Sequence, residues 1–367
     1  MTTVSFTGDI SFSKYFTGAY ERDFVHEGIL KFLSSSDHVV ANVECAVTGG
    51  DINSDRRLNH STPPEAAKVL DAMGADVWTL ANNHIMDCKE PGLQDTMENA
   101  KAHGAATLGV GRNVKEATTP VIWEQDGGIG VFSATYYREF LVCDEEKPGC
   151  LLLSETQRIK AVIKEIKSKC RWCVMVCHGG GEFAQLPLPY IRKRYKQFLS
   201  WGVDIVVGHH PHVVENYEFF GKKAIFYSLG NCIFDTDFQR AQKYTDCGML
   251  LKLHFEQDKW TWEHQAVKID RETQSLVPRE DPAIFRNITA AQYALLWPLA
   301  VADFVKNDRV AKCFNHPEFN EKPFSWYFKK WKNRHCLSAA ISFTAAPFLA
   351  KLGLWKLADK DIADYLQ

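Results

Sequence analysis

The stretch VDIVVGHHPHVVENYEFFGKKAIFYSLGN, residues 203–231, decides the fold. It opens on a continuous apolar run, residues 205–207, which is typical of a strand buried in a parallel sheet. Three imidazoles, those of His209, His210 and His212, follow that run directly. Open α/β sheets bind ligands at the carboxyl ends of their strands, so these imidazoles are predicted to lie at a ligand site. Because imidazole is the commonest metal ligand among side chains, the stretch predicts a metal centre.

Four other apolar segments, predicted as strands, also end in polar side chains. The segments span residues 4–7, 38–47, 75–80 and 172–177. The polar residues that they carry or lead into are Asp9, Asn42, Glu44, Asn83, His84 and His178. Taken singly, each could be a hydrogen-bonded core group or a turn residue. Together, carboxylate, amide and imidazole groups from five strand ends predict a pair of divalent ions, because one carboxylate can bridge two cations.

The order of the elements predicts an α/β fold built from strand–helix–strand units. A helix is predicted to begin at the capping-box sequence of residues 62–65. Residues 223–229, 248–255 and 260–267 are expected to form antiparallel strands. From about residue 281 the chain becomes aromatic and basic, which predicts a separate helical extension.

The composition is that of a soluble globular protein: 367 residues, 46% hydrophobic and 24% charged, with a net charge of −2. Nothing in this balance or in the motifs predicts nucleic acid as a partner. The 11 cysteines are scattered without the spacing of a disulfide framework, which favours reduced thiols and a cytoplasmic location. Residues 4–9 already predict a strand and a motif, so no signal peptide is expected, and no apolar run reaches the roughly 18 residues of a spanning helix.

In this order, the motifs resemble those of the calcineurin-like metallophosphoesterases. More closely, the chain resembles the poly-γ-glutamate capsule biosynthesis (CapA) family within that superfamily, over roughly residues 4–235. The motifs that carry the resemblance are Gly8-Asp9-Ile10-Ser11, Asn42-Val43-Glu44, Asn82-Asn83-His84 with Asp87, His178-Gly179-Gly180-Gly181-Glu182, Gly208-His209-His210-Pro211-His212 and Tyr227-Ser228-Leu229-Gly230-Asn231.

The resemblance implies a four-layer αββα sandwich of two mixed sheets in residues 1–280, which leaves residues 281–367 as the basic helical extension that the composition predicts. It also implies one or two divalent metal ions, of Mn, Fe, Zn or Mg. Glu44 would bridge them, and the catalytic residues would be Asp9 and His84, with His84 as transition-state donor or general acid. The implied metal ligands are Asp9, Glu44, Asn83, His178, His210, His212 and, as ligand or as neighbour of the ligands, His209.

One motif departs from the superfamily pattern, because Ser11 stands where the superfamily has a histidine; one metal would therefore lack a ligand. Substrate contacts are expected from polar residues of the same motifs and of the loop after Glu44. These residues are Asn42, Arg56, Arg57, His60, Glu182 and Asn231. The guanidinium forks of the two arginines suit phosphate or carboxylate, and solvated loop charges are the alternative.

Two functions from different classes follow from these expectations. The first is a metal-dependent phosphoesterase of capsule or surface-polysaccharide biosynthesis, which would hydrolyse an anionic, phosphorylated or glycan-related substrate with a metal-activated water. The second is a non-catalytic capsule-assembly component that binds an anionic polymer or a lipid-linked glycan in the metal cleft. Ser11 favours the second, whereas His84 and His178 favour the first.

The C-terminal extension raises a separate question about partners. Residues 323–358 contain no acidic side chain, and their basic residues are interleaved with aromatic ones. Such a segment can lie on an anionic membrane surface, here the inner face of the membrane. The alternative is a set of helices that pack on the core and point their lysines into solvent.

Overall fold

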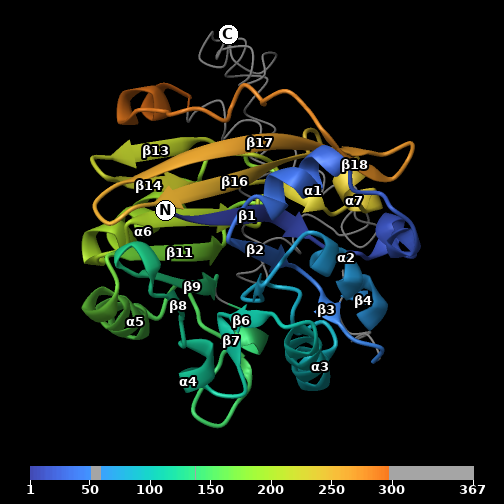
Figure 1. Cartoon of the computed structure of the whole chain (residues 1–367), viewed down its shortest axis with the longest axis horizontal. Coiled ribbons are helices and arrows are strands. Elements are labelled where there is room, and N and C mark those ends of the chain that lie inside the picture. Colours follow the sequence, from blue (N-terminus) through green and yellow to red (C-terminus); the bar gives the residue numbers. More distant parts are fainter. Residues whose placement is uncertain (51–58, 137, 297–367) are drawn as a thin grey trace, which may run out of the picture.

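The computed structural model describes residues 1–50, 59–136 and 138–296. Two mixed sheets lie face to face, and helices cover their outer faces (Figure 1). Helices α5 (Thr156–Lys169) and α6 (Pro189–Trp201) cover one flank, while α1 (Glu27–Ser34), α2 (Ala67–Ala72) and α3 (Lys89–Ala102) cover the other. The predicted four-layer αββα sandwich is confirmed.

The first sheet has eight strands in the order β18-β17-β16-β1-β2-β5-β6, with β15 pairing separately with β1. Strands β1, β2, β5 and β6 are parallel to one another, whereas β16 to β18 run antiparallel. The bounds are β1 (Thr2–Ile10), β2 (His38–Val43), β5 (Val77–Thr79), β6 (Ala106–Leu108), β15 (Asn231–Ile233), β16 (Cys247–Phe255), β17 (Trp260–Asp270) and β18 (Ser275–Pro278).

The second sheet has six strands in the order β13-β14-β12-β11-β9-β8. The four central strands are parallel, and the two edge strands β13 and β8 run antiparallel to their neighbours. The bounds are β8 (Val121–Trp123), β9 (Ile129–Thr135), β11 (Trp172–His178), β12 (Ile205–His209), β13 (Tyr217–Phe220) and β14 (Lys223–Phe226).

The remaining elements are short and lie outside the two large sheets and the five helices named above. They are the strand pairs β3 (Ala46–Val47) with β4 (Ser61–Thr62) and β7 (Val110–Gly111) with β10 (Gly149–Cys150), the helices α4 (Val114–Ala117) and α7 (Asp237–Arg240), and the 3-10 turns η1 (Lys14–Phe16), η2 (Ala19–Glu21), η3 (Pro64–Ala66), η4 (Gln125–Gly127) and η5 (Glu139–Leu141).

Strand β11 shows why the layers form, because both of its faces are apolar. Trp172, Val174 and Val176 belong to the cluster between the two sheets. The alternate residues Met175 and Cys177 belong to the cluster under α5 and α6. Successive strand side chains point to opposite faces, so a continuous apolar run must be covered on both sides.

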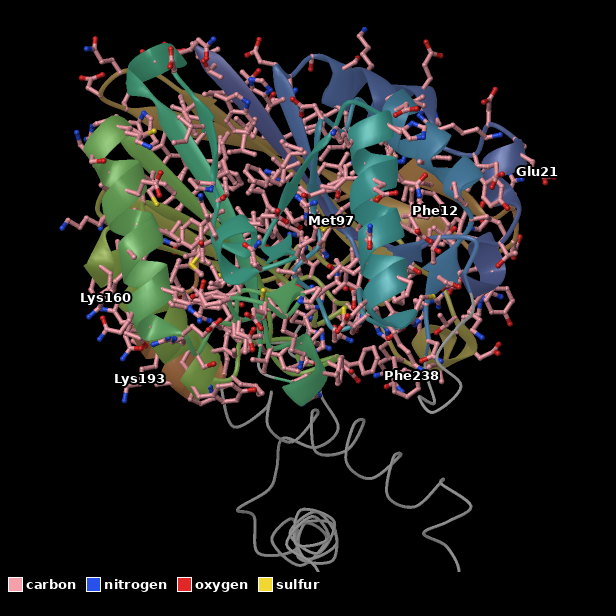
Figure 2. The ribbon with its side chains drawn as sticks, turned by 90° about the horizontal axis from the view of Figure 1, so that it is seen from below. Phe12, Glu21, Met97, Lys160, Lys193 and Phe238 are labelled. Carbon is pink, nitrogen blue, oxygen red and sulfur yellow. The ribbon has the colours of Figure 1, made fainter. Side chains whose placement is uncertain are left out.

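Helix α5 covers its sheet as its sequence pattern predicts. Ile159, Val162, Ile163 and Ile166 are buried, and each contributes about 1.5–3 kcal/mol through the loss of exposed apolar surface. On the opposite side of the helix layer, Lys160 of α5 and Lys193 of α6 point away from the molecule (Figure 2).

Two local predictions are wrong. The segment predicted as one strand ends at Val43, and Ala46–Val47 forms the separate strand β3. The capping box at residues 62–65 does not form, because Thr62 pairs with Val47 in the β3–β4 ladder; the predicted helix itself is present, since the 3-10 turn η3 begins at Pro64 and runs directly into α2. Backbone pairing between distant residues therefore replaces the local cap but not the helix.

The described chain continues to pack on the sheets as far as residue 296. Ile288 donates its backbone N–H to the Tyr217 carbonyl at 3.0 Å, and the Tyr293 hydroxyl donates to the Pro187 carbonyl at 2.7 Å. The predicted helical extension lies, from residue 297 onward, outside the described residues. None of the helices in the described ranges has the length and apolar character that crossing a bilayer demands.

Candidate metal centre

Side chains from both sheets meet at the carboxyl ends of the central strands. Asp9 of β1 lies beside Asn42 of β2, and His178 of β11 lies beside His209 of β12. Glu44 follows the end of β2 directly and donates its backbone N–H to the Ile10 carbonyl at 2.7 Å. The predicted strand ends therefore converge, because parallel neighbours finish at the same edge of their sheet.

The turn after β12 brings two more imidazoles to the same edge. His210 and His212 have backbone φ angles of 96° and 58°, in the left-handed region that only glycine adopts readily. Holding such angles costs on the order of 1–3 kcal/mol each and is typical of functional sites. At Gly208, an added Cβ would lie 1.9 Å from the Tyr227 carbonyl oxygen, so this position requires glycine.

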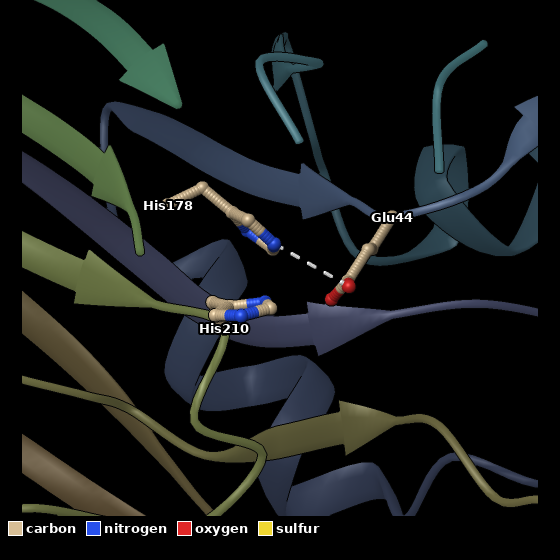
Figure 3. Close-up of side chains that lie close together, drawn as sticks. All are labelled: Glu44, His178 and His210. Carbon is tan, nitrogen blue, oxygen red and sulfur yellow. Dashed lines mark ion pairs between the residues drawn. The ribbon is translucent and has the colours of Figure 1, made fainter. Parts of the chain in front are cut away.

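Glu44 is shared by two groups of side chains that could each hold a metal ion. Within each group the ligand-capable atoms lie within 4.8 Å of one another. His178 Nε2 is 3.4 Å from Glu44 Oε1 (Figure 3), and His212 Nε2 is 3.7 Å from the same oxygen. The two groups are Asp9, Glu44 and His212, and Glu44, His178 and His210. Asn83 adjoins the second group, since its Oδ1 lies 2.8 Å from His178 Nε2.

The electrostatics of the centre fit a cation. Both carboxylate oxygens of Glu44 are buried, and neither accepts a hydrogen bond from the described residues. Burial raises the pKa of Glu44 to about 8 and lowers that of His178 to about 3. Burial likewise holds the pKa of His210 well below its usual range. Neutral imidazoles beside a buried carboxyl group without a hydrogen bond are the donor set that a divalent transition ion takes, and a cation would remove the cost of burying the ionised carboxylate.

Asp9 carries the negative charge of the first group. Burial alone would raise its pKa, but hydrogen bonds and charges from His209 and His212 hold it well below the usual range. Burial would also lower the pKa of His212, but Glu44 and Asp9 raise it to about 9. A metal that binds here must therefore displace a proton from His212.

Two asparagines expected to contact substrate are hydrogen-bonded within the protein. Asn42 donates from Nδ2 to Asp9 Oδ1 at 2.7 Å and accepts from the Thr79 hydroxyl at 2.9 Å. Asn231 Oδ1 lies 3.0 Å from His212 Nδ1, and its Nδ2 donates to the Thr245 carbonyl. Both amides are buried, so in this structure they orient Asp9 and His212.

His84 lies outside both ligand groups and forms a pair with a carboxylate. Its Nδ1 is 2.7 Å from Asp87 Oδ2, which also accepts the backbone N–H of His60 at 2.6 Å. The His60 ring meets the His84 ring edge-on, with 4.2 Å between their centroids. Asp87 thus fixes the orientation and tautomer of His84, and His60, expected at the substrate, packs behind it.

Ser11 and His209 lie beside the two ligand groups but are not members of them. The Ser11 hydroxyl lies 2.9 Å from that of Ser13 and 3.5 Å from His60 Nδ1, so it packs against the His84 side of the site. His209 Nδ1 lies 3.2 Å from Asp9 Oδ1, but His209 belongs to neither of the two groups. His209 is placed to orient Asp9.

Of the other expected substrate residues, Glu182 is half-buried, and its charge acts on the pKa values of His178 and His210. Arg56 and Arg57 lie outside the described residues. One residue at the site was not predicted: the ring of Tyr136 lies 4.7 Å from that of His210. Tyr136 directly follows β9, so the same strand-end pattern would have identified it.

Comparison with known proteins places this geometry in context. The family model described as "Bacterial capsule synthesis protein PGA_cap" matches residues 3–236. The capsule biosynthesis protein CapA of Bacillus anthracis is 28% identical over 253 residues, covering 65% of this chain and 61% of that protein. The PGA biosynthesis protein CapA of Bacillus subtilis is 29% identical over 249 residues, covering 65% of each. The chain therefore spans less than two thirds of the length of these relatives.

Solved structures are more distantly similar. A hypothetical protein from Thermus thermophilus has a TM-score of 0.45 and 13% identity, covering 73% of this chain and 99% of that protein. A 5'-nucleotidase from Candida albicans has a TM-score of 0.41 and 10% identity, covering 72% of this chain and 50% of that protein.

Proposed function

The chain belongs to the bacterial capsule synthesis protein family PGA_cap, and from this premise we propose that it is a metal-dependent phosphoesterase of capsule or surface-polysaccharide biosynthesis. The observation that carries the proposal is the buried carboxyl group of Glu44, which two groups of ligand-capable side chains share. Neither oxygen of this group accepts a hydrogen bond from the described residues. A shared carboxylate is the ligand that pairs of hydrolytic metal ions use.

The residues of the site divide into proposed metal ligands and residues that orient those ligands. One ion would be held by Asp9, Glu44 and His212, and the other by Glu44, His178 and His210 with the neighbouring Asn83. Bound divalent ions, of Mn, Fe, Zn or Mg, supply Lewis acidity to the phosphoryl oxygens and lower the pKa of a water molecule. Asn42 and His209 hold Asp9 in position, and Asn231 holds His212, through the hydrogen bonds described above.

His84 has the role of a donor to the substrate. Asp87 accepts a hydrogen bond from its Nδ1, which leaves Nε2 as the atom that can donate a hydrogen bond or a proton to the phosphoryl oxygens. A donor aimed at charge that develops in the transition state contributes about 10²- to 10³-fold to the rate. His84 is only 7% exposed, so little water competes for that donor.

A second candidate function is binding without catalysis, in which the cleft holds an anionic polymer or a lipid-linked glycan. The observation that favours it is Ser11, which stands at the position of a superfamily histidine and whose hydroxyl lies 2.9 Å from that of Ser13 and 3.5 Å from His60 Nδ1. With a ligand fewer, the first metal is bound more weakly, and a weakly held ion can still attract an anion without sustaining turnover.

Metal-dependent hydrolysis of bis-p-nitrophenyl phosphate separates the two functions. We expect turnover with added Mn²⁺ that disappears with EDTA and in the His84→Ala variant. The matched control is His103→Ala, which removes an exposed histidine whose Nδ1 lies 2.7 Å from Asp71 Oδ2, the same spacing as in the His84–Asp87 pair. Metal binding without hydrolysis in the wild type would leave the binding function in place of the enzymatic one.

A further inference from the structure

Strand β9 ends beside the second ligand group and leads into residues that the metal centre does not use. Its last residue, Thr135, lies beside His178 in the sheet, and the next residue, Tyr136, donates its backbone N–H to the His178 carbonyl at 2.9 Å. The Tyr136 ring lies against His210, with 4.7 Å between the centroids. Tyr136 is therefore fixed at both ends to residues of the second ligand group.

A guanidinium group, that of Arg138, lies against the Tyr136 ring. The Arg138 guanidinium carbon is 4.5 Å from the centroid of the Tyr136 ring. The Arg138 side chain is exposed, and no carboxylate of the described residues forms an ion pair with it. The partly buried Arg192, by contrast, donates from Nε and Nη2 to the two carboxylate oxygens of Glu218. Arg138 thus has a fixed platform and a charge that no described carboxylate neutralises.

We propose that Arg138, seated on Tyr136, is a second anion-binding site of the cleft, which takes a carboxylate or phosphate group of the substrate while the phosphoester lies at the Glu44 centre. This inference rests on the proposed function. A planar guanidinium binds both kinds of oxyanion through paired N–H donors, and stacking on an aromatic ring reduces the freedom lost on binding. The substrate class is accordingly a phosphoester with a second anionic group on the Tyr136 side.

The two anionic groups would be bound at different places. The Arg138 guanidinium carbon lies 4.5 Å from the centroid of the Tyr136 ring, and that ring, tilted by 38° to the His210 ring, lies 4.7 Å from it between centroids. A substrate that reaches both sites needs a linker between its phosphate and its second anion. Affinity should therefore depend on linker length and peak at one length.

The test is calorimetric binding to the full-length, Mn²⁺-loaded protein, which requires no turnover. The probes are phosphorylated ω-hydroxy carboxylates of increasing chain length, alkane bisphosphates of the same lengths, and plain alkyl phosphates as the reference. For the wild type, we expect one chain length at which a second anion tightens binding about tenfold, as a charge-assisted bidentate contact does. The arm with the larger gain identifies the second group as carboxylate or phosphate.

Three variants assign the gain to Arg138. Arg138→Ala should remove it and leave the affinity for alkyl phosphates unchanged, and Arg138→Lys should keep a part of it. Arg171→Ala is the matched control, because Arg171 is also exposed and lies 4.6 Å from an aromatic ring, that of Trp172, but at the opposite end of β11. It should bind as the wild type does.

The outcomes distinguish this inference from the function on which it rests. If alkyl phosphates bind and a second anion adds nothing at any length, or if the gain survives in Arg138→Ala, the second site is refuted and the phosphoesterase proposal stands. If alkyl phosphates fail to bind the Mn²⁺-loaded protein, the proposed function fails and the second site fails with it.

Discussion

Replacing Glu44 by glutamine should have opposite effects on the metal-free and the metal-bound protein. In the metal-free protein, burial raises the pKa of Glu44 from 4.5 to about 8. The native state therefore holds this proton more tightly than the unfolded state, and stability falls as pH rises from the unfolded pKa to the folded one. At about 1.4 kcal/mol per pH unit between 4.5 and 8, the loss amounts to about 5 kcal/mol and levels off above pH 8.

Glutamine has nearly the same shape and does not ionise, so it removes this loss. We expect metal-free Glu44→Gln to show a flatter dependence of stability on pH between pH 5 and 8 than the wild type, and to be at least as stable at pH 8.5. Metal should do the reverse. Ligand binding at 100 times its Kd stabilises a protein by about 2.7 kcal/mol, and the variant should lose most of that gain because the shared ligand is missing.

The assay is urea unfolding at several pH values, with EDTA and with Mn²⁺, together with metal content by mass spectrometry. The buried position of Glu44 makes both effects large enough to resolve in such data. Metal-dependent stabilisation of Glu44→Gln equal to that of the wild type would refute the assignment of Glu44 as the shared ligand. A variant as pH-dependent as the wild type would refute the electrostatic part.

Four further outcomes are expected. His84→Ala should lower hydrolysis about 10²-fold or more with metal content unchanged, because it is a donor rather than a ligand; parallel metal analysis checks this. Asn42→Ala should weaken metal binding about 10- to 100-fold by releasing Asp9, measured by metal titration. The double variant Arg56→Ala/Arg57→Ala should raise KM for an anionic substrate, and an unaltered KM returns both to solvated loop charges. Deleting residues 323–367 should abolish sedimentation with anionic vesicles, with neutral vesicles as the control.

Much of the site could be predicted from the sequence because its signals are local. A buried parallel strand is a continuous apolar run, and the polar residue that ends it lies at the sheet edge whatever the rest of the fold does. Asp9 and His178 were identified in this way, Glu44 as a polar residue within a predicted apolar strand, and the structure brings the three together. The family was predicted from the order of these same motifs and is confirmed by the match over residues 3–236.

What could not be predicted depends on contacts between distant residues. The amides of Asn42 and Asn231 are hydrogen-bonded to Asp9 and His212. Nothing in the local sequence of either asparagine shows whether its amide contacts another side chain or a substrate. The capping box predicted at residues 62–65 is replaced by a strand pairing of Thr62 that forms only in the folded chain, although the helix still begins at Pro64. Helix propensity and capping are weak terms that tertiary contacts override.

The most direct measurement of the central claim is anomalous X-ray scattering from crystals grown with Mn²⁺. The account predicts two anomalous peaks about 3.5–4 Å apart that flank the Glu44 carboxylate. Asp9 and His212 should ligate one, and His178 and His210 the other, with imidazole nitrogens about 2.0–2.3 Å from the ions. A single peak that Glu44 does not contact, or peaks away from these strand ends, would contradict it.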